Sequence, residues 1–152
     1  MGKTYFTADL HLGHRLVSGL RGFADPAEHD VVVAERWRSL VTADDVVWVL
    51  GDLAVTSSPR GIDDVLGKIA ELPGTKQLIA GNHDPVHPMH RDAHRWQRRY
   101  LEVFESVQAF GRRKIGLSVP AGQNSAQNVL LSHFPYRADH EAGALHGVPP
   151  AR

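Results

Sequence analysis

The feature that most constrains the fold is a short apolar run, Val46 to Leu50, which ends at Gly51. Every residue in this run is apolar, so the run predicts a strand that is buried on both faces. The segments around it alternate between strand-like and helix-like patterns, and such alternation is typical of parallel sheets covered by helices. The sequence therefore predicts an α/β fold built on a largely parallel sheet.

Apolar spacing predicts the other elements of the first half of the chain. Two short segments rich in β-branched and aromatic or apolar residues are expected to be strands, at residues 3–8 and 77–80. Apolar residues recur at helical spacing in three segments, residues 33–41, 62–70 and 93–101. The first half thus reads as strand, helix, strand, helix, strand, helix.

The second half of the chain is expected to consist mostly of strands that form a second sheet or extend the first. Three strand-like segments follow the last helix, at residues 107–110, 114–119 and 128–132. Gly111 is expected in a tight turn between the first two, because glycine suits such turns. The polar segment 120–127 is expected to be a loop.

Composition limits the possible chemistry. The chain has 152 residues, which predicts a single domain, and its equal numbers of basic and acidic residues argue against a general nucleic-acid coat protein. There is no cysteine, so disulfides, iron–sulfur clusters and cysteine nucleophiles are excluded. No apolar stretch is long enough to span a membrane, and the first residues do not form a signal peptide, so we expect a cytoplasmic protein.

Residues able to bind metal ions stand at the predicted strand ends. They occur as Asp9-Leu10-His11, Gly51-Asp52, Gly81-Asn82-His83-Asp84 and Ser132-His133. The carboxyl ends of parallel strands open into one crevice, so we expect these side chains to converge there. Asp9 and His11 would face the same side of an extended segment, and the two oxygens of Asp52 could bridge two ions. Mixed oxygen and imidazole ligands suit Mn²⁺, Fe²⁺, Zn²⁺ or Mg²⁺.

In this order, the motifs resemble those of the calcineurin-like metallophosphoesterase superfamily, in particular its bacterial and phage single-domain branch. The resemblance is carried by the segments Thr7–His14, Trp48–Asp52 and Leu131–Tyr136, and it extends from residue 4 to about residue 136. It implies a four-layer αββα sandwich of mixed sheets flanked by helices. It also implies a dinuclear centre, with Mn²⁺ as the first choice and Fe, Zn, Ni or Mg as alternatives.

The resemblance implies a ligand role for five residues. Asp9 and His11 would hold the first metal ion, Asp52 would bridge both ions, and Asn82 and His133 would hold the second. Members of the family attack phosphoesters with a metal-bound hydroxide. The expected function is therefore that of a hydrolase, a phosphodiesterase acting on small phosphodiesters or cyclic nucleotides.

Further roles concern the substrate. By resemblance, His83 lies over the substrate phosphate and assists departure of the leaving group, and Asp84 orients His83 by a hydrogen bond. Asn82 and His14 are further candidates for substrate contact, although a surface position for His14 is equally open. Arg21, in the long loop after the first motif, is left open as a contact to phosphate or base.

One motif of the family is missing. The family ends its site with a Gly-His-x-His sequence, whereas Leu145-His146-Gly147 is followed here by Val148-Pro149-Pro150. We therefore expect residues 1–152 to be a metallophosphoesterase domain that stops before its last strands, or else a shortened natural variant. Each ion then lacks one protein ligand, unless His140 or His146 substitutes.

The missing Gly-His-x-His motif leaves a second function open, namely that of a non-catalytic or weakly active remnant that binds metal or nucleotide. As partners we expect a small phosphoester or nucleotide substrate, no membrane and no long nucleic acid. A homo-oligomer is left open, since a sheet that lacks its last strands has an unpaired edge.

Overall fold

A parallel sheet of four strands organises the computed structural model, which describes residues 2–116 and 126–135. Its strands are β1 (Thr4–Thr7), β2 (Val46–Val49), β3 (Thr75–Ile79) and β4 (Ser106–Gln108). They lie side by side in chain order, and all three pairings are parallel. The predicted parallel sheet is thus confirmed, with the apolar run of β2 between β1 and β3.

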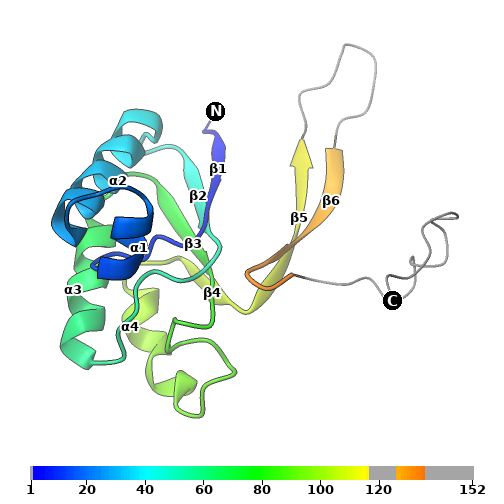
Figure 1. Ribbon diagram of the computed structural model, residues 1–152. Coiled ribbons are helices and arrows are strands. Elements are labelled where there is room, and N and C mark those ends of the chain that lie inside the picture. The colour runs from blue at the N-terminus through cyan, green and yellow to red at the C-terminus, as the bar shows by residue number, and fades with distance from the viewer. Residues whose placement is uncertain (1, 117–125, 136–152) are drawn as a thin grey trace, which may run out of the picture.

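The connections between these strands carry the helices. They are α1 (Arg15–Leu20), α2 (Pro26–Leu40), α3 (Pro59–Ala70), a short 3-10 helix η1 (Ala93–Arg95) and α4 (Gln97–Leu101). Each strand is added on the same side of the preceding one, so right-handed crossovers place all the helices on one face of the sheet. Figure 1 shows this arrangement. None of the described helices has the length and apolarity needed to cross a membrane.

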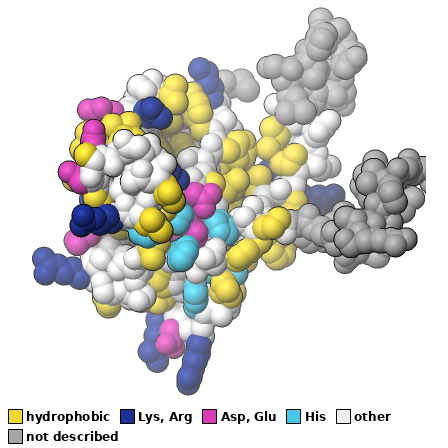
Figure 2. All heavy atoms as spheres, viewed as in Figure 1, with side chains coloured by type: hydrophobic (Ala, Val, Ile, Leu, Met, Phe, Trp, Pro, Cys, Tyr) yellow, Lys and Arg dark blue, Asp and Glu magenta, His cyan; other side chains and the backbone are white. Residues whose placement is uncertain are grey.

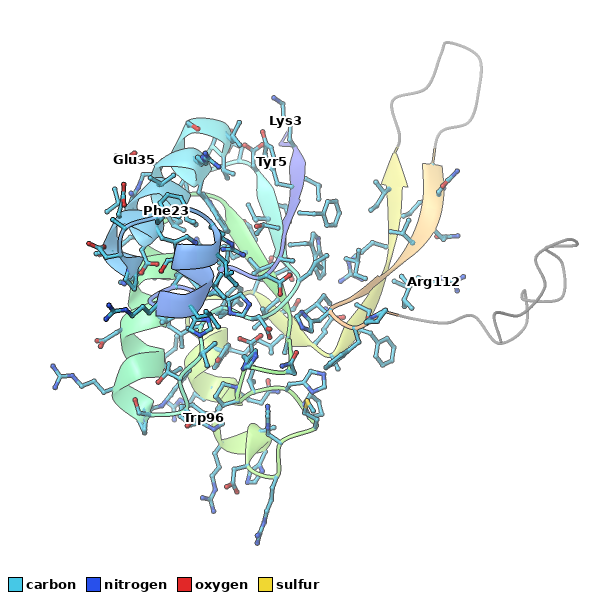
Figure 3. All side chains as sticks on the ribbon, in the orientation of Figure 1. Lys3, Tyr5, Phe23, Glu35, Trp96 and Arg112 are labelled. Atoms are coloured by element: carbon cyan, nitrogen blue, oxygen red, sulfur yellow. The ribbon has the colours of Figure 1, made fainter. Side chains whose placement is uncertain are left out.

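The main core lies between the helices and the parallel sheet. It includes buried side chains of β2, β3, α2 and α3, among them Val47, Val49, Leu78, Trp37, Ile62, Leu66 and Ile69. Tyr5 of β1 (labelled in Figure 3) packs against this core, and its hydroxyl donates to the carbonyl of Leu40 at the end of α2. The core fixes the positions of the strand ends.

A two-stranded antiparallel sheet lies against the opposite face of the parallel sheet (Figure 1). It consists of β5 (Phe110–Gly116) and β6 (Ala126–Ser132). A small second core joins the two sheets through Trp48, Ile79 and Leu131, and the guanidinium of Arg113 lies 4.4 Å from the centre of the Trp48 ring. The described residues thus form three layers, of helices, parallel sheet and hairpin.

The expected turn at Gly111 is wrong. Gly111 lies inside β5, and β4 and β5 belong to different sheets. A Cβ at Gly111 would lie 3.2 Å from Gln108 Oε1 and 3.4 Å from Ile79 Cδ1, so this glycine permits close packing where the chain passes between sheets.

Helix α1 was not expected. The end of the predicted strand 114–119, most of the predicted loop, and His140 and His146 lie outside the described residues.

Candidate metal centre

The chemistry-bearing motifs meet at the carboxyl ends of the parallel strands. Asp9 follows β1, Asp52 follows β2, and Asn82 follows β3, while His133 comes directly after β6 of the hairpin. Figure 2 shows acidic and histidine side chains gathered together on this face. Donor atoms of Asp9, Asp52 and His133 all lie within 4.8 Å of one another. The structure therefore brings together side chains from three strand ends and from the hairpin.

The first group of donors consists of Asp9, His11 and Asp52. His11 Nε2 lies 3.7 Å from Asp9 Oδ1 and 3.8 Å from Asp52 Oδ2. These separations are too long for hydrogen bonds, so the three groups face one another without direct bonding. Burial lowers the pKa of His11 below its ordinary value, and Asp52 and Asp9 offset this only in part. The lowered pKa favours the neutral imidazole that metal ions require.

The second group consists of Asp52, Asn82 and His133. His133 Nδ1 lies 2.8 Å from the carbonyl oxygen of Leu50. Because a carbonyl can only accept, Nδ1 carries a proton and donates to it, so Nε2 is the ring nitrogen that faces the centre. Nε2 in turn lies 3.0 Å from Asn82 Oδ1 and 3.6 Å from Asp52 Oδ1. One imidazole nitrogen and two oxygens therefore converge, and all three can offer lone pairs to a cation once Nε2 carries no proton.

Asp52 belongs to both groups. Its Oδ2 faces His11, whereas its Oδ1 faces His133 and also accepts the backbone N–H of His83 at 2.9 Å. The residue is only 4% exposed, so its charge is largely withdrawn from water. A carboxylate that turns one oxygen to each set of donors has the geometry of a bridging ligand.

The backbone is strained at three of these residues. Among the described residues, three that are not glycine have positive φ, and these are Asp9 (54°), His11 (47°) and Asp52 (56°). Such conformations cost about 1–3 kcal/mol each and cluster at functional sites. The expectation that Asp9 and His11 lie on an extended segment is therefore wrong. Their side chains converge because left-handed residues fold the loop, and not because of strand alternation.

Two glycines allow the loops of the centre to approach closely. A Cβ at Gly51 would lie 2.6 Å from the backbone nitrogen of Gly81 and 2.6 Å from His133 Nδ1. A Cβ at Gly81 would collide with the Asp52 carboxylate. Packing thus requires glycine at both positions.

Asp84 differs from its expected role. It is 1% exposed, and its carboxylate accepts hydrogen bonds from the backbone amides of Gly81 (2.7 Å), Asp52 (2.9 Å) and Leu53 (3.0 Å). Burial raises the pKa of Asp84, and these amide bonds act against that rise. Both oxygens are directed to the loop backbones after β2 and β3, so Asp84 ties these loops together instead of orienting His83.

His83 and His14 lie beside the ligands. The His83 side chain is exposed, and its ring centre lies 5.8 Å from that of His11. With Asn82, it lines a hollow of about 600 Å³ that Arg91 and Trp96 also border. The ring of His14 lies 5.5 Å from that of His11, and the Nδ1 atoms of His14 and His11 are buried without a hydrogen-bond partner among the described residues. Both candidates thus adjoin the centre.

Sequence reasoning missed two contacts. His90 Nε2 lies 2.9 Å from the carbonyl oxygen of Asn82 and braces the loop after β3. No periodicity in the sequence indicated this, because His90 lies in an irregular segment. Arg21 was left open as a substrate contact, but its guanidinium donates to the carbonyl oxygens of Asp9 (2.7 Å) and Leu10 (3.3 Å).

The fold and the centre together define an α/β protein with acidic, amide and imidazole donors at the carboxyl end of a parallel sheet. No protein-family model matches the sequence. The chain is 46% identical over 147 residues to the Gene 66 protein of Mycobacterium phage L5, a match that covers 96% of this chain and 70% of the relative. It is 45% identical over 142 residues to the Gene 66 protein of Mycobacterium phage D29, covering 93% and 68%. The chain belongs to this family of mycobacteriophage Gene 66 proteins.

A solved structure shares the fold. It is the crystal structure of AQ665, a protein of unknown function from Aquifex aeolicus, with a TM-score of 0.58 and 24% sequence identity. The match covers 91% of this chain and 64% of that one. The likeness supports the mixed α/β architecture, and the phage relatives support the expectation of a phage-type protein.

Proposed function

We propose that the protein is a dinuclear metal-dependent phosphodiesterase that hydrolyses small phosphodiesters or cyclic nucleotides. The observation that carries this proposal is the orientation of Asp52. Its two oxygens lie 3.8 Å from His11 Nε2 and 3.6 Å from His133 Nε2, respectively. A buried carboxylate shared between two sets of donors is the arrangement that a two-ion hydrolytic site requires.

We also propose membership of the calcineurin-like metallophosphoesterase superfamily, with its four-layer αββα sandwich. The support is the order of the motifs along the chain together with the three layers of helices, parallel sheet and hairpin. In this proposal, the β5–β6 hairpin is part of the second sheet. A cytoplasmic location and a small substrate instead of a long nucleic acid belong to the same proposal.

The donor geometry supports two ligand sets. Asp9, His11 and Asp52 would hold one ion, and Asp52, Asn82 and His133 would hold the other, with Mn²⁺ as the first candidate. Such ions supply positive charge that binds the phosphate and lowers the pKa of water. The protein contributes the fixed loop backbones, the converging imidazoles and the buried shared carboxylate, so the donors need little rearrangement when metal binds.

His83 is the proposed general acid. Its imidazole is exposed beside the centre, and its backbone N–H is bound to Asp52 Oδ1, so the loop that carries it is fixed to the bridging residue. From this position the ring can hold a proton for the oxygen of the departing alcohol, a role that contributes about a hundred- to ten-thousand-fold in rate. Asn82 and His14 would border the bound phosphoester.

A second candidate is a weakly active or non-catalytic module that binds metal or nucleotide. One observation favours it: among the described residues, each set has only three protein donors. Water can complete such a set, but the affinity for metal is then lower. Under this alternative the protein binds Mn²⁺ and does not turn over substrate.

The experiment is a Mn²⁺ titration of hydrolysis, with bis-p-nitrophenyl phosphate and a 2′,3′-cyclic nucleotide as substrates. We expect activity that rises with Mn²⁺ well beyond one equivalent per site and that is lost in Asp52→Asn. Mn²⁺ binding without hydrolysis of either substrate would favour the second candidate. Absence of both binding and hydrolysis would contradict the metal centre itself.

A further inference from the structure

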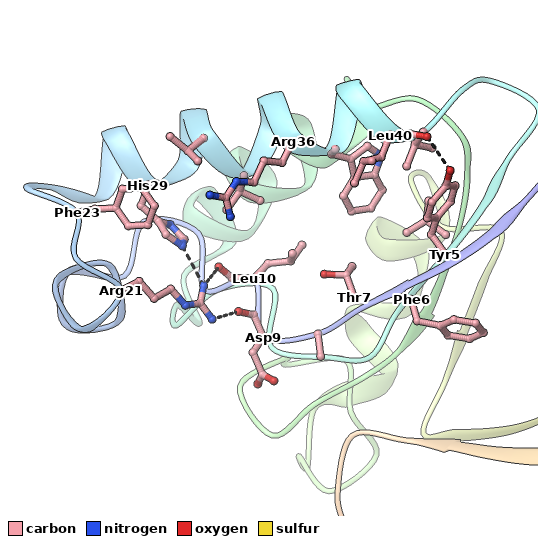
Figure 4. A pocket seen from close by; sticks show the side chains of 16 residues that line it. Tyr5, Phe6, Thr7, Asp9, Leu10, Arg21, Phe23, His29, Arg36 and Leu40 are labelled. Atoms are coloured by element: carbon pink, nitrogen blue, oxygen red, sulfur yellow. Dashed lines mark hydrogen bonds between the residues drawn. The ribbon is translucent and has the colours of Figure 1, made fainter.

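Two buried polar residues stand next to each other on α2, in a helix that otherwise faces the core with apolar side chains. His29 is 0% exposed and Asp30 is 9% exposed. Burying such groups is costly unless they are hydrogen-bonded. His29 borders a groove of about 400 Å³ between β1 and α2, and Figure 4 shows that Arg21 reaches it from the facing loop.

The hydrogen bonds define the protonation of His29. Arg21 Nη1 lies 2.9 Å from His29 Nε2, and a guanidinium can only donate. Nε2 is therefore the acceptor, and the single proton of the neutral ring is on Nδ1. Nδ1 lies 3.1 Å from Asp30 Oδ1 and donates to it. Asp30, His29 and Arg21 thus form a directed chain, which we call the Arg21–His29–Asp30 chain.

Both ends of this chain reach the loop that carries Asp9 and His11. At one end, Arg21 donates to the carbonyl oxygens of Asp9 and Leu10 (Figure 4). At the other end, Asp30 Oδ1 accepts the backbone N–H of Gly13 at 3.0 Å. The Arg21–His29–Asp30 chain therefore contacts this loop, which we call the ligand loop (residues 9–13), at both of its ends.

The far side of Asp30 is anchored to α3. Lys68 Nζ donates to Asp30 Oδ2 at 2.7 Å. Burial acts to raise the pKa of Asp30, but the bonds from Lys68, Gly13 and His29 outweigh it and hold the pKa below its ordinary value. These three bonds therefore favour the ionised carboxylate.

The loop held in this way is the strained one. Asp9 and His11 have φ of 54° and 47°, which are left-handed conformations that non-glycine residues adopt only when surrounding contacts hold them there. Two bonds to the loop after β2, from the N–H of Asp9 to Gly51 and from the N–H of His11 to Asp52, hold it from one side. The Arg21–His29–Asp30 chain holds it from the other side, so the loop is fixed between two supports.

We infer that Arg21, His29 and Asp30 are positioning residues that hold the Asp9–His11 loop in the strained conformation needed to bind the first metal ion. This inference rests on the metal centre proposed above. It assigns to Arg21 a role without substrate contact. It also explains why two polar residues occupy adjacent buried positions of α2.

The test separates the two ion sites and uses Mn²⁺ alone as the probe. His133→Ala leaves only the first donor set intact, and His11→Ala leaves only the second. Arg21→Met is then introduced into each background of the full chain, and Mn²⁺ binding is measured by calorimetry and by loss of the free-ion EPR signal. We expect Arg21→Met to weaken the first site at least about tenfold, in the range known for residues that support metal ligands, and the second site less than twofold.

Two further variants serve as controls. Arg36→Met removes another arginine from the same groove that has no described bond to the ligand loop, and it should leave both sites unchanged. Arg21→Lys keeps the charge but not the forked donor, so it should fall between the wild type and Arg21→Met. Amide exchange of the metal-free protein should accelerate at His11 and Gly13 in Arg21→Met, while β2 and β3 keep their protection.

Each outcome decides the matter. Equal weakening of both sites, or loss of protection throughout the sheet, would reduce the role of Arg21 to general stability and overturn the inference. Binding in Arg21→Met equal to that in Arg36→Met would overturn it as well, with the metal centre intact. If the wild type binds no Mn²⁺ at all, the proposed metal centre fails and the inference fails with it.

Discussion

The two donor groups of the centre are supported in different ways. The first group lies on a loop with left-handed residues, bonded to the neighbouring loop after β2 and to the Arg21–His29–Asp30 chain. The second group depends on His133, which comes from a separate two-stranded sheet. That sheet meets the parallel sheet through a small core of Trp48, Ile79 and Leu131.

The difference indicates which part of the fold positions the side chains of each donor group. The first group is an extension of the main core, so it persists as long as the parallel sheet is folded. The second is complete only when the hairpin is docked, and three buried residues provide a modest driving force for docking. Damage to the hairpin should therefore affect one ion site selectively, whereas damage at the shared residue should affect both.

The largest effect is expected at the shared residue. Asp52→Asn removes the charge that faces both His11 and His133, so both ions should be lost at micromolar Mn²⁺ and hydrolysis should fall to background. Metal content after dialysis and the rate with bis-p-nitrophenyl phosphate measure this. If Asp52→Asn retained one ion at wild-type affinity, the two groups would not share a ligand.

The next largest effect is expected at His83, which belongs to neither donor group. His83→Ala should leave the Mn²⁺ content near that of the wild type while the rate falls at least about a hundredfold. Its backbone bond to Asp52 remains, so the loop keeps its place. Loss of metal equal to that of Asp52→Asn would refute this separation of roles.

An intermediate effect is expected from the hairpin. Leu131→Ala removes a side chain that is 6% exposed from the small core and should destabilise the hairpin by about 2–4 kcal/mol, within the range for large-to-small core substitutions. The site containing His133 should weaken severalfold, while the site containing His11 changes little. Leu130→Ala, at a neighbouring position that is 46% exposed, is the matched control. Equal weakening of both sites would contradict the proposed independence.

The smallest effect concerns pH and touches only the first group. The pKa of Asp30 lies below its ordinary value of 3.8 in the folded protein, so its ionised form stabilises the fold above that pH. This contribution is lost as the pH falls through the folded pKa. Asp30→Asn should therefore lower the melting temperature of the metal-free protein at pH 7, and the difference from wild type should shrink below about pH 4.

Melting curves between pH 3 and pH 7 in the presence of a chelator check this expectation. Asp63→Asn is a suitable control, because it removes one carboxylate from an exposed ion pair with Arg99. A difference between Asp30→Asn and wild type that stays constant over this range would contradict the assignment of the ionised form.

Local patterns were sufficient to predict most elements. The stripe from Ile62 to Ala70 and the run from Val46 to Leu50 became α3 and β2, because each pattern matches the period of its element and its face is buried. The sequence also placed the donor residues at strand ends. Prediction failed for Gly111, which lies inside β5 beside Gln108 and Ile79 and not in a turn.

The support of the centre could not be predicted in the same way. His29 and Asp30 are adjacent polar residues that resemble a solvated helix face, and only their partners Arg21 and Lys68 make their burial possible. The left-handed backbone at Asp9 and His11 likewise depends on the loop across from it. Such features arise from contacts between distant segments, which neither periodicity nor composition records.

The bond between His133 and Leu50 joins residues 83 positions apart, and that between His133 and Asn82 joins residues 51 apart. Closing such large loops slows folding relative to the formation of local contacts. The sheet and the first donor group can therefore form before β6 is synthesised, whereas the second group is complete only after it. Pulsed hydrogen exchange during refolding should show β1–β3 protected before β6. In the proposed centre, the first ion site is then complete before the second.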